Sequence, residues 1–212
     1  MKREWRDWAM LGGLIVVFSA GVIFFDGWSR VAWALVLGML LATLIVFWLI
    51  GGDITSLTWV RGAVGERQTE EALGELPGGW RVFHDLPDGR GNLDHVAIGP
   101  GGVFAIDTKT YSASAKVEND VLRSGGIHTP GVAFRGSAVR LKETLERETG
   151  VTTWVQAVVA IWGEFPQGHV EEQQVVYIEA DRLRGWLESR DAQLSRDRHY
   201  RLVTALEILD RR

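Results

Sequence analysis

Two aspartates and a lysine occupy matched positions in two neighbouring apolar segments of this chain. Asp94 lies at the start of the segment LDHVAIG, Asp107 lies near the end of VFAIDTK, and Lys109 follows two residues later. Two carboxylates beside an ammonium group can hold a divalent metal ion and activate a water molecule. This combination is the chemistry of metal-dependent phosphodiester hydrolysis.

A tight turn between the two segments decides whether these side chains meet. The sequence Gly99-Pro100-Gly101-Gly102 separates them and favours a β-hairpin. A hairpin closed about Pro100 and Gly101 places alternate residues of both arms on one face of the sheet. The predicted cross-strand pairs on that face are Ile98 with Val103, Val96 with Ala105 and Asp94 with Asp107.

Opposed carboxylates repel each other, so a cation is expected beside them. Mg²⁺ suits Asp94 and Asp107 because it takes oxygen ligands and retains water, and Mn²⁺ is the expected substitute. Lys109 is then placed to orient the attacking water or to stabilise the developing negative charge. The alternative for an Asp-x-Lys pattern is a solvated strand end, and the pattern alone does not separate the two.

The N-terminal quarter of the chain differs in composition from the rest. Residues 8–25 and 31–50 contain no charged residue, and their lengths of 18 and 20 residues match the ~20 needed to cross a hydrocarbon core. Tryptophans lie near the ends of both segments, where an aromatic belt is expected. The sequence therefore predicts two transmembrane helices that form a hairpin within residues 1–52, followed by a separate domain at 53–212.

Positive charges flank the predicted membrane hairpin and give its orientation. The basic residues outside it are Lys2, Arg3, Arg6, Arg61 and Arg67, whereas the connecting loop contains only Arg30. The positive-inside rule then predicts a multi-pass protein of the cell membrane, with both termini and residues 53–212 in the cytoplasm. The absence of cysteine is compatible with a reducing compartment.

Residues 53–212 are expected to form an α/β domain after a break at Gly51-Gly52. The order of elements predicts a mixed sheet flanked by helices. Ser195 is a plausible N-cap for the last helix. Helices are predicted over residues 65–76, 131–148, 182–188 and 196–209, and strands over 80–86, in both hairpin arms, and over 116–123, 152–162 and 174–178.

The charge balance of this domain limits how it can contact a polyanion. Residues 53–212 carry 19 of the 23 basic residues and 24 of the 27 acidic residues, which gives a net charge of −5. An acidic domain is not suited to indiscriminate binding of nucleic acid. Any such contact needs a local basic patch, or a metal ion that offsets the acidic site.

Several separated blocks of this domain resemble the NERD (nuclease-related) domain. They agree with that family in order and spacing, and the resemblance covers roughly residues 61–162. The family is regarded as a branch of the PD-(D/E)xK nuclease superfamily. The resemblance therefore implies a restriction-endonuclease-like core, with 163–212 as a C-terminal extension. The matching blocks are residues 62–66 (GAVGE), 84–86 (HDL), 92–95 (NLDH) and 102–109 (GVFAIDTK).

The resemblance also implies roles for individual residues. Asp94 corresponds to the central aspartate of the superfamily, Asp107 and Lys109 to its (D/E)-x-K pair, and Glu66 to the acidic residue of the first helix. Asp107 stands where Glu is common, and the helix start after Pro130 lacks a Gln that the family tends to carry. By itself, Glu66 is also explained as a charge favoured at the start of a helix.

Two functions follow from these observations. The first is a membrane-anchored nuclease-related protein that hydrolyses DNA or RNA with Mg²⁺, using Asp94, Asp107, Lys109 and Glu66. The alternative is a catalytically inactive module of the same fold that binds nucleic acid or a protein partner at the cytoplasmic membrane face. The intact set of acids and lysine favours the first, whereas the acidic balance and the missing Gln favour the second.

The remaining histidines and arginines carry weaker signals. His95 points to the face opposite Asp94, which favours packing or hydrogen bonding over metal ligation. His84 and His128 lack partners at ligand spacing, so a structural zinc site is not expected. The cationic residues of the helix that follows Pro130 are more simply a solvated helix face than phosphate contacts. These residues are Arg135, Arg140 and Lys142.

Overall fold

The computed structural model describes residues 27–211. The chain divides into two compact units, Met1–Thr58 and Trp59–Arg212. Helix α2 (Trp28–Gly74) contains residues of both. It continues through Gly51 and Gly52, so the break predicted there is wrong. Each glycine costs a helix only about 1 kcal/mol relative to alanine, which a long helix tolerates. The helix predicted at 65–76 is the last part of α2.

The predicted membrane hairpin is only partly open to comparison with this structure. Residues 8–25 lie outside the described residues, and residues 31–50 lie within α2. None of the helices within residues 27–211 combines the length and the hydropathy required of a membrane span. The transmembrane hairpin is therefore not supported.

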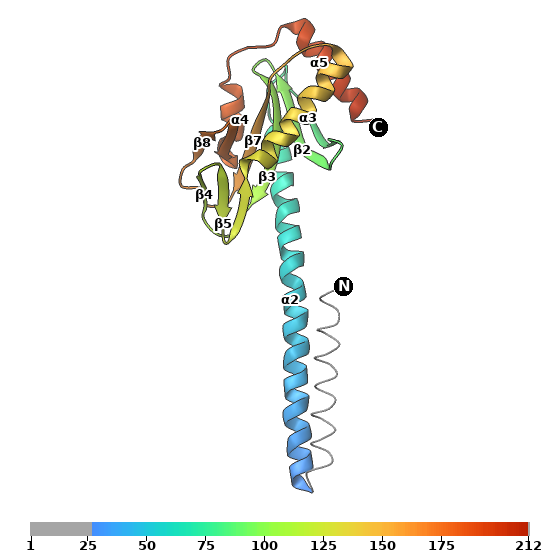
Figure 1. Ribbon diagram of the computed structural model, residues 1–212, viewed down its shortest axis with the longest axis vertical. Helices are drawn as coiled ribbons and strands as arrows, with labels where there is room; N and C mark the ends of the chain where they lie inside the picture. Colours follow the sequence, from blue (N-terminus) through green and yellow to red (C-terminus); the bar gives the residue numbers. More distant parts are fainter. Residues whose placement is uncertain (1–26, 212) are drawn as a thin grey trace. The chain divides into compact units, whose positions relative to one another are not determined.

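A six-stranded mixed sheet forms the centre of the second unit (Figure 1). Its strand order is β1-β2-β3-β7-β9-β8. β1, β2 and β3 are antiparallel, β3, β7 and β9 are parallel, and β8 is antiparallel to β9. The strands are β1 (Arg81–Pro87), β2 (Asn92–Gly99), β3 (Gly102–Thr110), β7 (Val155–Trp162), β8 (His169–Glu172) and β9 (Val175–Glu179).

Helices cover both faces of this sheet, as the sequence predicts. α3 (Gly131–Thr149) and α5 (Arg196–Leu209) pack on one face through the larger of two apolar clusters. The end of α2 and α4 (Ala180–Glu188) pack on the other face through the second cluster. We call these the α3 face and the α2 face. Ser195 caps α5, as predicted, by accepting a hydrogen bond from the Arg198 backbone N–H.

The hairpin of β2 and β3 has the predicted register. Ile98 pairs with Val103 and Val96 pairs with Ala105. The two-residue turn closes between Gly99 and Gly102, and Gly102 has a φ of +132° that other residues rarely adopt. The ladder ends at the pair of His95 with Ile106. Asp94 and Asp107 therefore lie one position beyond the last β2–β3 pair, so the predicted cross-strand pair of Asp94 with Asp107 is not formed, and Asp107 pairs with Val159 of β7 instead.

A second, three-stranded sheet follows β3. It consists of β4 (Ala115–Glu118), β5 (Val121–Ser124) and β6 (Ile127–Pro130). The prediction of one strand over 116–123 is wrong because Asn119 and Asp120 form a tight turn, with φ values of 53° and 60°. Asn and Asp tolerate this left-handed conformation better than other side chains. We call this second sheet the small sheet.

Candidate functional site

Asp94 is fixed by the backbone of the neighbouring strand. Its Oδ2 accepts a hydrogen bond from the Thr108 backbone N–H at 2.7 Å. The β2–β3 ladder has ended at this point, and the Asp94 carboxylate accepts the hydrogen bond of the Thr108 N–H in place of a backbone carbonyl. Since Thr108 lies between Asp107 and Lys109, this bond ties all three sequence-predicted residues of the hairpin to one strand end.

Asp107 and Lys109 form an ion pair on that strand end. Lys109 Nζ also donates to the Thr108 carbonyl at 3.3 Å and lies 5.9 Å from the centre of the Phe134 ring. The Lys109 and Asp107 side chains remain 34% and 36% exposed. Both side chains are therefore partly open to solvent, although Asp107 Oδ1 is itself buried.

The charges of the site influence one another. Burial raises the pKa of Asp107 to about 6, with Lys109 opposing the shift and Asp94 and Glu66 adding to it. Burial and the charge of Asp94 likewise raise the pKa of Glu66, which Lys109 opposes. Glu66 is exposed on α2. These three carboxylates lie close enough to repel one another, and we call them, with Lys109, the carboxylate site.

Lys109 is the cation of the carboxylate site. Burial alone would lower the pKa of its ammonium group, but Asp107 and Asp94 outweigh this and hold the pKa above its ordinary value. Lys109 therefore stays protonated at neutral pH. It is suited to donate hydrogen bonds and to stabilise negative charge, and not to act as a general base.

A small cavity adjoins the carboxylate site on the α3 face. Its volume is about 20 Å³, and its lining includes Asp94, Asp107, Phe134 and Ser137. A space of this size accommodates about one water molecule. The site thus has room for a solvent molecule directly between the two aspartates and α3.

Gly65 allows α2 to approach the end of β3. A Cβ atom at Gly65 would lie 2.0 Å from Thr110 Oγ1 and 3.2 Å from Trp162 Cδ1. No side chain fits in that space without displacing its neighbours. The glycine thereby brings the next residue, Glu66, to the strand ends that carry Asp94 and Lys109. This is a physical reason for the Gly-Glu sequence in the first matching block.

A buried hydroxyl connects α2 with β3 and β7. Thr69 Oγ1 donates to the Gly65 carbonyl at 3.0 Å. It accepts hydrogen bonds from Thr108 Oγ1 at 3.1 Å and from Trp162 Nε1 at 2.8 Å. Sequence reasoning missed Thr69 and Thr108. The one available signal was a threonine one helical turn after Gly65, which is weak.

The histidines of β1 and β2 lie on the α2 face. His84 Nδ1 and His95 Nδ1 share a hydrogen bond at 2.8 Å, with the rings in edge-to-face contact. His95 is buried, and burial lowers its pKa to about 4, with His84 adding to the shift. The predicted hydrogen-bonding role of His95 is confirmed, and its partner is His84.

Two arginines of α3 hold turns in place. Arg140 Nε donates to Asp88 Oδ2 at 3.0 Å, which ties the turn between β1 and β2 to α3. Arg135 donates two hydrogen bonds to the Asp120 carboxylate, at 2.9 and 2.8 Å. The interpretation of these residues as a solvated helix face is wrong for both. Neither guanidinium is available as a free phosphate contact.

The residues of the site fit a hydrated divalent ion. Within residues 27–211, no three or more His, Asp or Glu side chains are grouped as a ready-made metal site. One oxygen each of Asp94 and Asp107 has a protein partner. The second oxygen of each is left for a ligand. Mg²⁺ typically binds one or two carboxylates and retains several waters, so two repelling carboxylates match it.

The part of the chain that carries the site is similar to a known family. Residues 61–162 match the NERD family, described as the nuclease-related domain. The matched segment contains all four residues of the carboxylate site. No curated protein and no solved structure matches the chain. The mixed sheet flanked by helices is consistent with a nuclease-like fold.

Proposed function

We propose that the nuclease-related domain at residues 61–162 hydrolyses phosphodiester bonds of DNA or RNA with Mg²⁺, or with Mn²⁺ as a substitute. One observation carries the proposal. Asp94, Asp107 and Lys109 meet at the end of the β2–β3 hairpin, with the charge of Glu66 close enough to raise the pKa of Asp107. These are the residue types that metal-dependent hydrolysis needs.

Each residue of the carboxylate site has a proposed task. Asp94 and Asp107 would hold the ion, and Glu66 would add negative charge at its open side. A bound Mg²⁺ supplies an activated water and neutralises charge on a phosphate. Lys109, protonated, donates to a phosphate oxygen or orients water. The Thr108 backbone N–H keeps the Asp94 carboxylate in position.

A cleavage assay on the full chain tests this function. The substrates are single- and double-stranded DNA and RNA, each incubated with Mg²⁺, with Mn²⁺ or with EDTA. We expect cleavage of at least one substrate with metal and none in EDTA. If no substrate is cleaved and calorimetry detects no binding of Mg²⁺ or Mn²⁺, the proposed hydrolysis is wrong.

A second candidate function is a binding module that does not cleave. The observation in its favour lies at the start of α3, where the family tends to carry a Gln. Here Arg135 occupies the first turns of α3 and is committed to Asp120 and to the Gln173 carbonyl. This alternative predicts no cleavage under any metal condition in that assay, together with binding of a labelled oligonucleotide measured by fluorescence anisotropy.

We further propose that residues 8–25 and 31–50 attach the domain to the cytoplasmic side of the cell membrane. The support is the sequence alone: two uncharged segments with basic residues outside them. After extraction of membranes with alkaline carbonate, the full chain is expected in the pellet. Its release into the soluble fraction would contradict the attachment.

A further inference from the structure

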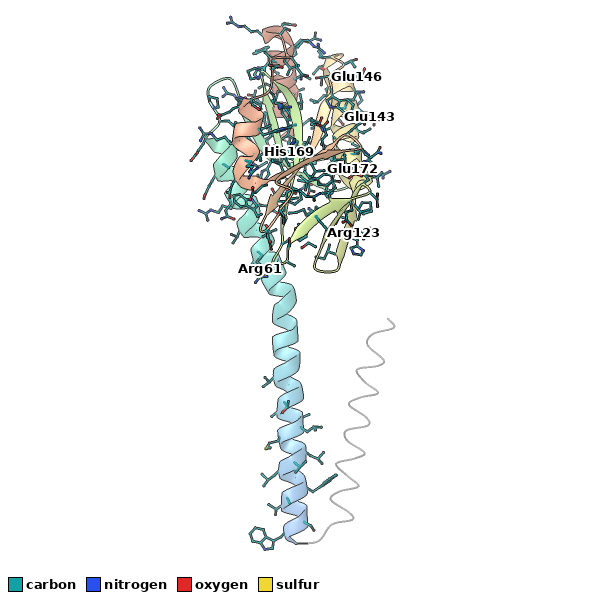
Figure 2. The ribbon with its side chains drawn as sticks, turned by 90° about the vertical axis from the view of Figure 1, so that its left-hand side faces the viewer. Arg61, Arg123, Glu143, Glu146, His169 and Glu172 are labelled. Atoms are coloured by element: carbon teal, nitrogen blue, oxygen red, sulfur yellow. The ribbon has the colours of Figure 1, made fainter. Side chains whose placement is uncertain are left out.

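Three basic side chains form a row across the small sheet. Lys116 of β4 pairs with Arg123 of β5, and Arg123 pairs with His128 of β6. Residues paired directly in an antiparallel sheet point to the same face, so the three side chains are neighbours. We call them the basic row. Figure 2 shows Arg123 on its strand, apart from the labelled Glu143 and Glu146 of α3.

Folding stability does not explain the basic row. Like charges directly opposite each other on a sheet are destabilising. Lys116 has one acidic partner, the exposed Glu118, at 2.9 Å. Among the described residues, no side chain forms an ion pair or a hydrogen bond with the Arg123 or His128 side chain, although the charge of Arg123 helps to lower the pKa of Glu118. Arg135 and Arg140, by contrast, are both committed to carboxylates.

The basic row faces an open hollow of about 560 Å³. This volume lies in the range of ligand sites, ~300–1,000 Å³. The turn Gly125-Gly126 forms part of its lining and adds no side chains. Gln167, from the segment after β7, also lines it. Its amide is fixed to the Val117 backbone by hydrogen bonds of 2.7 and 3.2 Å, so that wall is held in place.

The small sheet is joined to the carboxylate site through two connections within the second unit. β6 leads directly into α3, whose Phe134 lines the cavity beside Asp94 and Asp107. Tyr111, two residues after Lys109, lies close enough to Thr129, the neighbour of His128, for the Thr129 side chain to oppose the rise in the pKa of Tyr111. A polymer bound on the basic row therefore lies on elements that also build the carboxylate site.

We propose that the basic row binds the phosphates of a polynucleotide backbone and presents the strand to the carboxylate site. This rests on the proposed function for the identity of the polymer. An arginine fork matches the geometry of phosphate, and lysine and histidine donate to single phosphate oxygens. Because the domain has a net charge of −5, such a local row is the means by which it can hold a polyanion.

The test compares two double variants of the full chain with equal charge changes. K116E/R123E reverses two charges of the basic row. R81E/R196E reverses two exposed arginines of β1 and α5. Binding of a short labelled single-stranded oligonucleotide is measured by fluorescence anisotropy in EDTA, where no metal-dependent cleavage occurs, at several salt concentrations. Circular dichroism confirms that both variants are folded.

We expect K116E/R123E to bind the oligonucleotide at least about 10-fold more weakly than the wild type at low salt. The slope of log K against log salt concentration is expected to decrease in magnitude by about 1.5, because two phosphate contacts are lost. R81E/R196E is expected to stay within about 2-fold of the wild type. Equal affinities of the two variants would overturn the proposal. So would a K116E/R123E protein that loses only its binding to phosphatidylglycerol vesicles, since the row would then recognise a membrane.

The same two variants separate this proposal from the proposed hydrolysis. If the wild type fails to cleave but K116E/R123E loses oligonucleotide binding, the basic row is supported and the hydrolysis fails. If the wild type cleaves and K116E/R123E binds and cleaves like R81E/R196E, the hydrolysis stands and the basic row fails.

Discussion

An Asp107→Asn substitution is expected to lower metal-dependent cleavage by about 10³-fold. Asparagine keeps the shape of the side chain but removes the charge that would hold a divalent ion beside Asp94. Initial rates of substrate cleavage at saturating Mg²⁺ measure the effect. Asp191→Asn, at an exposed carboxylate of the segment after α4, is the matched control and is expected to cleave like the wild type.

The same substitution is expected to preserve or raise stability. Burial raises the pKa of Asp107 from 3.8 to about 6, so the folded chain keeps a proton there that the unfolded chain releases. The contribution of Asp107 to stability is therefore lost as pH rises from about 4 to about 6. Asparagine cannot ionise and avoids this loss. Because Asp107 is 36% exposed, we expect a gain of only about 1 kcal/mol above pH 6.

The expected effect of Asp107→Asn on stability is tested by urea denaturation of the wild type and the variant below about pH 4 and above about pH 6. The difference in unfolding free energy is expected to favour the variant increasingly as pH rises. A variant that loses cleavage together with several kcal/mol of stability would show that Asp107 supports the fold and would contradict its assignment to the site.

A Gly163→Ala substitution is expected to destabilise the domain by about 3 kcal/mol. Gly163 follows β7 with a φ of +114°, and an added Cβ would lie 2.4 Å from the Tyr111 carbonyl oxygen. That oxygen belongs to the backbone and cannot rotate away as a side chain could. The Tyr111 backbone N–H also donates a hydrogen bond to the Trp162 carbonyl at 3.0 Å, which holds this segment against the end of β7. The strand end that carries Lys109 must shift, so cleavage is expected to fall as well.

Gly78→Ala is the control for this substitution. Gly78 has no positive φ, and no atom lies within 4 Å of an added Cβ. Its effect on stability is expected within about 0.5 kcal/mol. Both variants are compared by urea denaturation followed by tryptophan fluorescence. If Gly163→Ala were as stable as Gly78→Ala, the backbone after β7 would have made room for the added methyl group without a loss of stability, which would contradict the prediction.

The parts of the fold that sequence predicts are those with local causes. The β2–β3 register follows from alternating apolar residues and a glycine-rich turn, and this register brings Asp94 near Asp107. The bounds of α5 follow from periodicity and from the Ser195 cap. In each case the residues that decide the structure lie within a few positions of one another.

The parts that sequence misses depend on distant partners. The hydrogen bond between Thr69 and Thr108 joins residues 39 positions apart, and no periodicity marks either one. The close approach that requires Gly65 involves Thr110 and Trp162 on two other elements. β6 and β8 are short, and their pairing with neighbours, not their own composition, makes them strands.

The burial of His95 beside His84 has a consequence for the proton balance of folding. Burial lowers the pKa of His95 from 6.5 to about 4 and raises that of Asp107 from 3.8 to about 6. Between these limits the folded chain lacks a proton on His95 that the unfolded chain holds, and holds one on Asp107 that the unfolded chain lacks. Folding then takes up almost no net protons from this pair of groups. The opposite pKa shifts of Asp107 on the α3 face and of His95 on the α2 face of one hairpin therefore cancel in the proton balance of folding.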